Sequence, residues 1–138
     1  RVHGQNKRNY HKYIGMGGRM DTIQAAVLLE KLHIFDNELI KRNALADKYA
    51  KKYAKEFITP RVPESYYSSW AQYTVMSEER DRAIGKLRTN GIPTMIYYQK
   101  CLHEQKAFDY LGYNAGDFPK SEYLANLVFS LPMHAYMD

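Results

Sequence analysis

Residues 22–57 contain no glycine or proline, and their apolar side chains recur every three or four positions. That spacing predicts a long amphipathic helix. Its apolar face carries, in order, Ile23, Ala26, Val27, Ile34, Leu39, Ala46, Tyr53 and Phe57, and a second row of Leu28, Leu32 and Phe35 widens the first half. We therefore expect the first half to be buried more deeply than the lysine-rich second half. A kink or a break between two helices is expected at residues 35–37, because Asp36 or Asn37 could cap a new helix.

The rest of the chain is divided by proline and glycine into short segments. In chain order the pattern predicts an irregular segment at 1–14, a strand at 70–76, a helix at 78–90, a strand at 92–98, a helix at 102–111, a helix opening at 117–119 and an extended end at 130–133. Asn90-Gly91 and Gly112 are expected to close the first two of these helices. The fold class is therefore α/β, or a small α+β domain, in which a long helix precedes a small sheet covered by helices.

The chain has 138 residues, of which 45% are hydrophobic and 25% charged, as in ordinary globular domains. It has no apolar run of about 18 residues, the length that would span a membrane. It also begins without a signal-peptide pattern. Because residue 1 is not methionine and residues 130–138 stop in mid-pattern, we expect a piece of a longer chain.

The single cysteine, Cys101, excludes an internal disulfide and a cysteine-rich metal site, and it fits a reducing, cytoplasmic location. His3, His11 and His33 do not have metal-ligand spacing, so no metal is expected. The formal charge is +5, but the basic residues are interspersed with acidic ones, as on a solvated helix face. Thirteen tyrosines could stack on bases, yet no nucleic-acid-binding signature accompanies them. We expect no nucleic-acid partner.

A glycine-rich turn at residues 15–18 leads directly into the long helix. Glycine allows positive φ and close backbone approach, and Asp21 with Gln24 three residues later is typical of a capping box. The free N–H groups of a helix start favour an anion, and Arg19 adds a guanidinium that could grip a phosphate or carboxylate. The alternatives are a simple tight loop and an Arg19 that pairs with Asp21.

A second candidate lies at residues 96–103. Tyr97 and Tyr98 are adjacent, so in a strand they point to opposite sides, and one of them could face a ligand. Alternatively, both only cover the sheet. His103 follows, either as a proton-transfer group or as a cap or hydrogen-bond partner. The chain has no Gly-x-Ser-x-Gly nucleophile elbow, no Walker-type phosphate-binding loop and no dinucleotide fingerprint.

Taken together, these segments resemble the DegT-type sugar aminotransferase family, and within it most closely the aminotransferases of UDP-linked 3-keto uronic acids. The resemblance keeps its order over nearly all of the chain. It rests on His3-Gly4, Gly15-x-Gly17-x-Arg19-Met20-Asp21-x-x-Gln24-Ala25-Ala26, Lys31-Leu32, Arg42, Tyr49, Trp70-Ala71-Gln72-Tyr73, Arg80-Asp81, Gly91-Ile92-Pro93-Thr94, Tyr97-Tyr98, Leu102-His103-x-Gln105, Gly116-Asp117-Phe118-Pro119 and Leu131-Pro132-Met133.

The resemblance implies a fold-type I enzyme that uses pyridoxal 5'-phosphate. Such an enzyme moves an amino group from glutamate to a nucleotide-linked keto-sugar, for surface glycan biosynthesis. Residues 1–35 would be the end of the large cofactor domain, and residues 36–138 the small C-terminal domain. The Schiff-base lysine would lie before residue 1, so this segment alone should be inactive. A DegT-like regulatory or dehydrating homologue without aminotransferase activity is the alternative.

The resemblance also assigns site residues in a homodimer with shared active sites. The glycine-rich loop would reach the cofactor in the partner subunit. Gly17 stands where the family usually has asparagine, so backbone N–H groups of Gly17 and Gly18 would contact the cofactor phosphate. Arg19, Tyr97, Tyr98 and His103 would bind the substrate. Arg19 suits a sugar carboxylate, and Tyr97 replaces the usual histidine.

Overall fold

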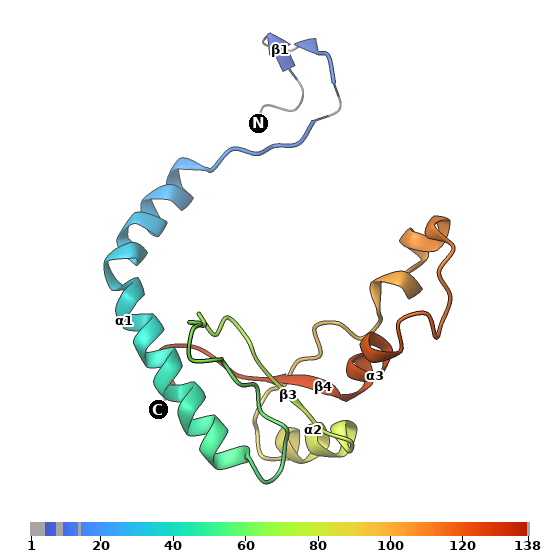
Figure 1. Cartoon of the computed structure of the whole chain (residues 1–138). Coiled ribbons are helices and arrows are strands. Elements are labelled where there is room, and N and C mark those ends of the chain that lie inside the picture. Colours follow the sequence, from blue (N-terminus) through green and yellow to red (C-terminus); the bar gives the residue numbers. More distant parts are fainter. Residues whose placement is uncertain (1–4, 8–9, 14, 138) are drawn as a thin grey trace. The chain divides into compact units, whose positions relative to one another are not determined.

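The computed structural model describes residues 5–7, 10–13 and 15–137. The chain divides into two compact units, Arg1–Asn37 and Glu38–Asp138. The first unit contains β1 (Gln5–Lys7) and β2 (Tyr10–His11), which pair antiparallel where an irregular segment was expected. An exposed segment without regular structure, residues 15–21, then leads into helix α1 (Thr22–Tyr53; Figure 1).

Helix α1 begins where the sequence predicts. The Asp21 side chain accepts a hydrogen bond from the Ile23 N–H at 2.9 Å, and the Asp21 backbone carbonyl accepts one from the Ala25 N–H at 2.8 Å. Of the kink or break expected at residues 35–37, the break is wrong, because α1 is one continuous helix from residue 22 to residue 53. Asp36 and Asn37 are compatible with a helix interior, and no glycine or proline interrupts the ladder of backbone hydrogen bonds.

The burial of α1 is the reverse of the expected order. Its first half exposes large apolar side chains, such as Ile23 at 77% and Leu32 at 63%, whereas Leu45 and Ala46 in the second half are buried. The apolar stripe of the first half is therefore not covered by other described residues of its own unit.

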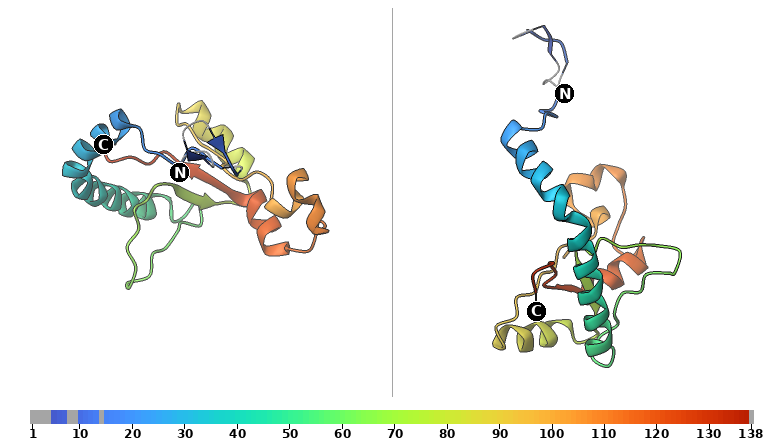
Figure 2. Two further views of the ribbon diagram at one scale, coloured as in Figure 1. Left: turned by 90° about the horizontal axis from the view of Figure 1, so that it is seen from above. Right: turned by 90° about the vertical axis from the view of Figure 1, so that its left-hand side faces the viewer.

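The second unit is built on two antiparallel strands, β3 (Tyr73–Met76) and β4 (Val128–Leu131). Tyr73 pairs with Leu131 and Val75 pairs with Phe129, so the alternation predicted for this strand places these four side chains in the core. Figure 2 shows the two strands from two further sides, with α3 (Pro119–Leu127) at the end where β4 begins. The core also takes Ala46 from α1 and Leu87 from α2 (Arg80–Thr89). The predicted mixed fold, in which helices cover a small sheet, is confirmed.

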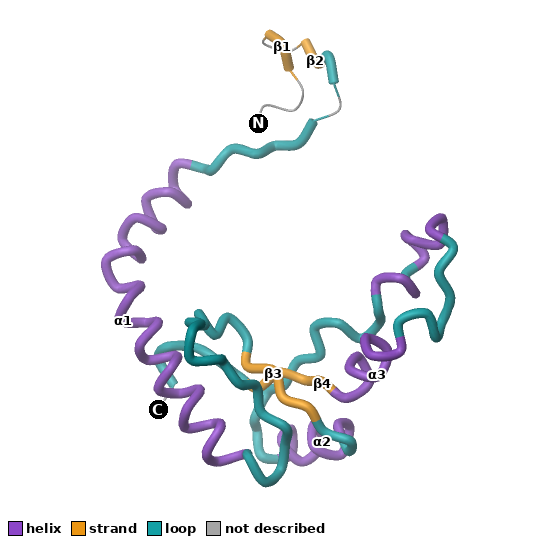
Figure 3. Tube along the Cα trace, in the orientation of Figure 1, coloured by secondary structure: helices purple, strands orange, loops and turns teal. Residues whose placement is uncertain are grey.

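Two predicted elements differ from the structure. Residues 92–98 form no strand, and Figure 3 shows them as loop. Only Met95 makes a bridge, exchanging backbone hydrogen bonds with Ser130 at 2.7 and 3.1 Å. Pro93 has no N–H to donate, which limits ladder formation. The predicted helix at 102–111 is two 3-10 helices, η1 (Leu102–Glu104) and η2 (Lys106–Leu111), because Gln105 between them is extended. Gly112, with φ 74°, closes η2 as expected.

Tyr73 and Tyr49 provide a matched test of this core. The Tyr73 hydroxyl is buried near Thr59, but among the described residues it makes no hydrogen bond of good geometry, and burial raises its pKa. The Tyr49 hydroxyl donates to the Pro132 carbonyl at 3.0 Å. Because a buried unpaired polar group is costly, Tyr73→Phe should raise the free energy of unfolding of the full-length protein by about 1 kcal/mol. Tyr49→Phe should lower it by about 1 kcal/mol. Chemical denaturation measures both, and a larger loss for Tyr73→Phe than for Tyr49→Phe would contradict this assignment.

Candidate functional site

The glycine-rich loop lies in the first unit, and residues 15–21 are all exposed. The Gly18 N–H donates to the Met16 carbonyl at 3.1 Å, so the turn itself uses one of the two backbone donors proposed for an anion. Positive φ is found at Gly91, Gly112 and Gly116, which all lie in the second unit. The Arg19 side chain is exposed beside this turn.

Tyr97 and Tyr98 lie in the second unit, in the loop that follows the Met95 bridge. They are 53% and 73% exposed, and they line different hollows. Tyr97 borders a hollow of about 180 Å³ with Pro93 and Met133. Tyr98 borders one of about 340 Å³ between the loop and α3, with walls from Leu124 and others. Both rings are therefore available for contact with another molecule.

His103 is held inside the second unit by a carboxylate. Its Nε2 lies 3.0 Å from Oε1 of Glu122, and its side chain is only 7% exposed. The imidazole also packs against the Phe118 ring at 4.8 Å between centroids. Of the two roles that the sequence leaves open for His103, the structure shows the hydrogen-bond partner. Tyr98 and His103 border neighbouring hollows, which share Cys101, Leu102 and Ser121.

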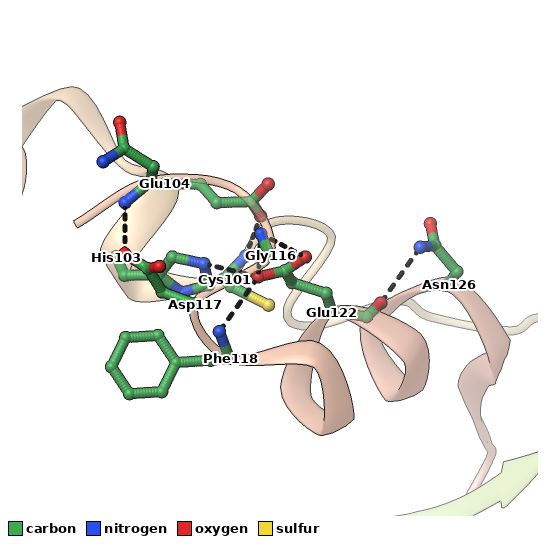
Figure 4. A network of polar contacts seen from close by, with 9 residues as sticks. Cys101, His103, Glu104, Gly116, Asp117, Phe118, Glu122 and Asn126 are labelled. Atoms are coloured by element: carbon green, nitrogen blue, oxygen red, sulfur yellow. Dashed lines mark hydrogen bonds and ion pairs between the residues drawn. The ribbon is translucent and has the colours of Figure 1, made fainter.

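Glu122 was not among the residues singled out from the sequence. Figure 4 shows its carboxylate beneath the turn that precedes α3. Its oxygens accept hydrogen bonds from the Gly116 N–H at 2.9 and 3.0 Å and from the Phe118 N–H at 3.2 Å. An acidic residue in the first turn of a helix that opens with Phe118-Pro119 is the signal that could have identified it, because such residues bond the free N–H groups of a helix start.

The charge state of this cluster follows from these contacts. The Gly116 N–H, followed by the Phe118 N–H and His103, lowers the pKa of Glu122 against the opposing effect of burial. Burial and the nearby Glu104 carboxylate raise the pKa of the Cys101 thiol. Cys101 is therefore protonated at neutral pH, and it has the character of a packing residue, not of a nucleophile.

An apolar hollow of about 400 Å³ lies against the His103–Glu122 cluster. Its walls come from η1, η2, the following turn and α3, and they include Leu102, Phe108, Leu111, Tyr113 and Phe118. Among the described residues, no group of histidine, cysteine and acidic side chains is arranged to hold a metal ion. No helix in the described part of the chain combines the length and apolar character needed to cross a membrane.

The Glu122 contacts predict a pH dependence of stability. Because the pKa of Glu122 is lowered by folding, its carboxylate stabilises the folded state above its ordinary pKa of 4.5. That stabilisation is lost as the pH falls below 4.5 and through the folded-state pKa. We expect Glu122→Gln to remove this part of the acid dependence in the full-length protein, measured as thermal stability between neutral and acid pH. Equal acid slopes for the variant and the wild type would contradict the assignment.

Comparison with known proteins places these residues in a family. Residues 1–138 match the model of the DegT/DnrJ/EryC1/StrS aminotransferase family. The chain is 36% identical to the UDP-2-acetamido-2-deoxy-3-oxo-D-glucuronate aminotransferase of Pseudomonas aeruginosa, over 99% of this chain and 37% of that protein. It is 35% identical to the pleiotropic regulatory protein of Geobacillus stearothermophilus, over 96% of this chain and 37% of that protein.

A solved relative has the same fold. The crystal structure of a DegT DnrJ EryC1 StrS aminotransferase from Brucella abortus matches with a TM-score of 0.84 and 40% identity, over 99% of this chain and 36% of that one. This chain thus spans little more than a third of the length of these relatives. The match over all of its residues shows that the chain belongs to the DegT/DnrJ/EryC1/StrS aminotransferase family.

Proposed function

We propose that the protein carrying this chain is an aminotransferase that uses pyridoxal 5'-phosphate. It moves the amino group of glutamate to a keto-sugar linked to a nucleotide, of the UDP-2-acetamido-3-keto-glucuronic acid type, for surface glycan biosynthesis in the cytoplasm. The observation that carries this proposal is the 36% identity, over 99% of this chain, to a UDP-2-acetamido-2-deoxy-3-oxo-D-glucuronate aminotransferase. Residues 1–35 belong to the large domain and residues 36–138 to the small one.

The glycine-rich loop fits the phosphate end of this cofactor. Residues 15–18 are exposed and include three glycines, so a phosphate can approach the backbone at Gly17 and Gly18 without meeting a Cβ. The loop also precedes α1, a helix of 32 residues, whose N-terminus attracts negative charge. We assign the phosphate contact to Gly17 and Gly18, and the Gly18 N–H would exchange its bond to the Met16 carbonyl for one to the phosphate. The cofactor, when bound, carries the amino group between donor and acceptor. The lysine that tethers it belongs to the part of the protein outside this chain.

The direct substrate contacts are assigned to Arg19, Tyr97 and Tyr98, and His103 contributes to substrate binding through the segment that carries the two tyrosines. The exposed guanidinium of Arg19 can bind the uronic carboxylate through two parallel hydrogen bonds. Tyr97 and Tyr98 present exposed rings and hydroxyls to the sugar nucleotide. The paired imidazole of His103 supports the segment that carries them.

A homodimer with shared active sites completes the proposal. Its support is the apolar surface along the first half of α1, where Ile23, Val27, Leu29 and Leu32 are each more than half exposed. A surface of that kind is normally covered by another domain or subunit. A DegT-like regulatory homologue without aminotransferase activity is the alternative, since the pleiotropic regulatory protein is 35% identical to this chain.

The activity test uses the purified full-length protein loaded with pyridoxal 5'-phosphate. Glutamate and the UDP-linked 3-keto uronic acid should give 2-oxoglutarate and the aminated sugar in equal amounts. Enzyme-coupled detection of 2-oxoglutarate and mass spectrometry of the sugar measure the two products, and omission of the keto-sugar is the control. Absence of both products under these conditions would refute the transferase and leave the regulatory homologue.

Arg19 offers a test of the substrate class. Loss of a charge-assisted pair costs about 1.5–3 kcal/mol, so Arg19→Ala should raise KM for the keto-uronic substrate roughly 10- to 100-fold. The matching keto-sugar with a neutral hydroxymethyl group should be affected much less. Arg19→Lys should recover only part of the loss, because an ammonium group lacks the planar fork.

Arg82→Ala is the matched control, since Arg82 is an exposed arginine of α2 that pairs with Glu79. It should behave as the wild type with both substrates. If Arg19→Ala lost equal amounts of activity on the acidic and the neutral substrate, Arg19 would not be the carboxylate ligand.

A further inference from the structure

Glu122 joins three separate segments of the second unit. One carboxylate accepts hydrogen bonds from the His103 imidazole of η1, from the Gly116 N–H of the preceding turn, and from the Phe118 N–H at the start of its own helix. Its side chain is 23% exposed, so these contacts are partly shielded from water. Charge-assisted hydrogen bonds of this kind are roughly twice as strong as neutral ones. Glu122 therefore fixes η1 and the turn against α3.

The turn is shaped to meet this carboxylate. Gly116 has φ 96°, a backbone conformation that residues other than glycine rarely adopt. Its N–H donates to both Glu122 oxygens. Phe118 packs its ring against the rings of His103 and Tyr113. These ring contacts and the Glu122 hydrogen bonds hold the same two segments together.

The segment that carries the exposed tyrosines is held at both ends. At one end Met95 is bonded to Ser130 of β4. At the other end η1 begins, where the Cys101 N–H donates to the Glu104 carboxylate at 3.2 Å and His103 is bonded to Glu122. Residues 96–100 between these points have no regular structure. The position of Tyr98 therefore depends on both anchors, and the second depends on Glu122.

We propose that Glu122 is a positioning residue for the acceptor substrate. It acts by fixing His103 and the Gly116 turn, and thereby places the Tyr97–Tyr98 segment against the sugar nucleotide. The proposal rests on the proposed function, because it takes the keto-sugar as the molecule that this segment contacts. It assigns Glu122 no contact with the reacting atoms.

The test separates the two halves of the reaction in the full-length, cofactor-loaded enzyme. Glu122→Gln keeps the size of the side chain but removes its charge. We expect KM for the keto-sugar to rise roughly tenfold, which is less than the loss on the order of a hundredfold caused by a displacement of about 1 Å at the reacting groups themselves. KM for glutamate and the rate of its half-reaction, followed by cofactor absorbance, should remain within twofold. A merely structural defect would impair both half-reactions together.

Glu78→Gln is the matched control. Glu78 also uses its carboxylate to bond α3, accepting from the Tyr123 hydroxyl at 2.8 Å, but it has no bond to η1 or to the Gly116 turn. It should leave both KM values unchanged. His103→Gln retains a donor that can reach Glu122, so it should recover most of the acceptor affinity that His103→Ala loses.

The outcomes distinguish the two proposals. A wild-type enzyme that transfers the amino group, together with a Glu122→Gln variant of unchanged acceptor KM, would overturn the positioning role alone. An equal loss in both half-reactions would also overturn it. Should Glu122→Gln fail to fold, Gly116→Ala removes the favourable turn conformation and must show the same selective rise in acceptor KM. A wild-type enzyme without any transfer would overturn both proposals.

Discussion

The pairing of β3 with β4 is the constraint on which the second unit depends. A two-stranded ladder is marginally stable by itself, so it must bury its inner face against other elements. Here the inner face consists of Tyr73, Val75, Phe129 and Leu131. Tyr49 of α1 packs edge-on against Tyr73 at 5.2 Å between ring centroids, and Phe57 meets Phe129 at 5.4 Å. The end of a long helix and two short strands therefore share one aromatic core.

The same ladder positions the candidate site of this unit. Ser130 is buried in β4, where its hydroxyl meets that of Thr74 at 2.8 Å and its backbone bonds Met95 on the other side. The irregular segment from Met95 to η1 thus starts at the core and ends at the Glu122 carboxylate. Fixing both ends of a short loop limits the conformations it can adopt, which lowers the entropy lost when it contacts a ligand. The loop that carries the two exposed tyrosines is therefore restricted in conformation, although it lies at the surface.

The sequence predicted the parts of this protein that depend on local pattern. The glycine-free period of residues 22–57, the pattern at 70–76, and the signals at Asp21 and Pro119 located α1, β3 and α3. Gly112 closes η2 as its position predicts. The ordered motifs identified the family, which the match over all residues confirms. The assignments of Gly17, Gly18, Arg19, Tyr97 and Tyr98 to cofactor and substrate also came from the sequence, and they stay predictions.

Tertiary structure decided what local pattern leaves open. Of residues 92–98, only Met95 pairs with β4, so this segment makes a bridge and does not form a strand. The pattern of residues 92–98 does not specify how many of them will find a backbone partner in another strand. Helix α1 continues through Asp36 and Asn37 because it is helical on both sides of them. These two residues can be accommodated in a helix interior as well as at a helix cap. The role of His103 depended on Glu122, 19 positions away in the sequence. The sequence by itself determined α1, β3, α2 and α3 and the family, because these follow from neighbouring residues and ordered motifs. The fold alone decided which distant side chains meet.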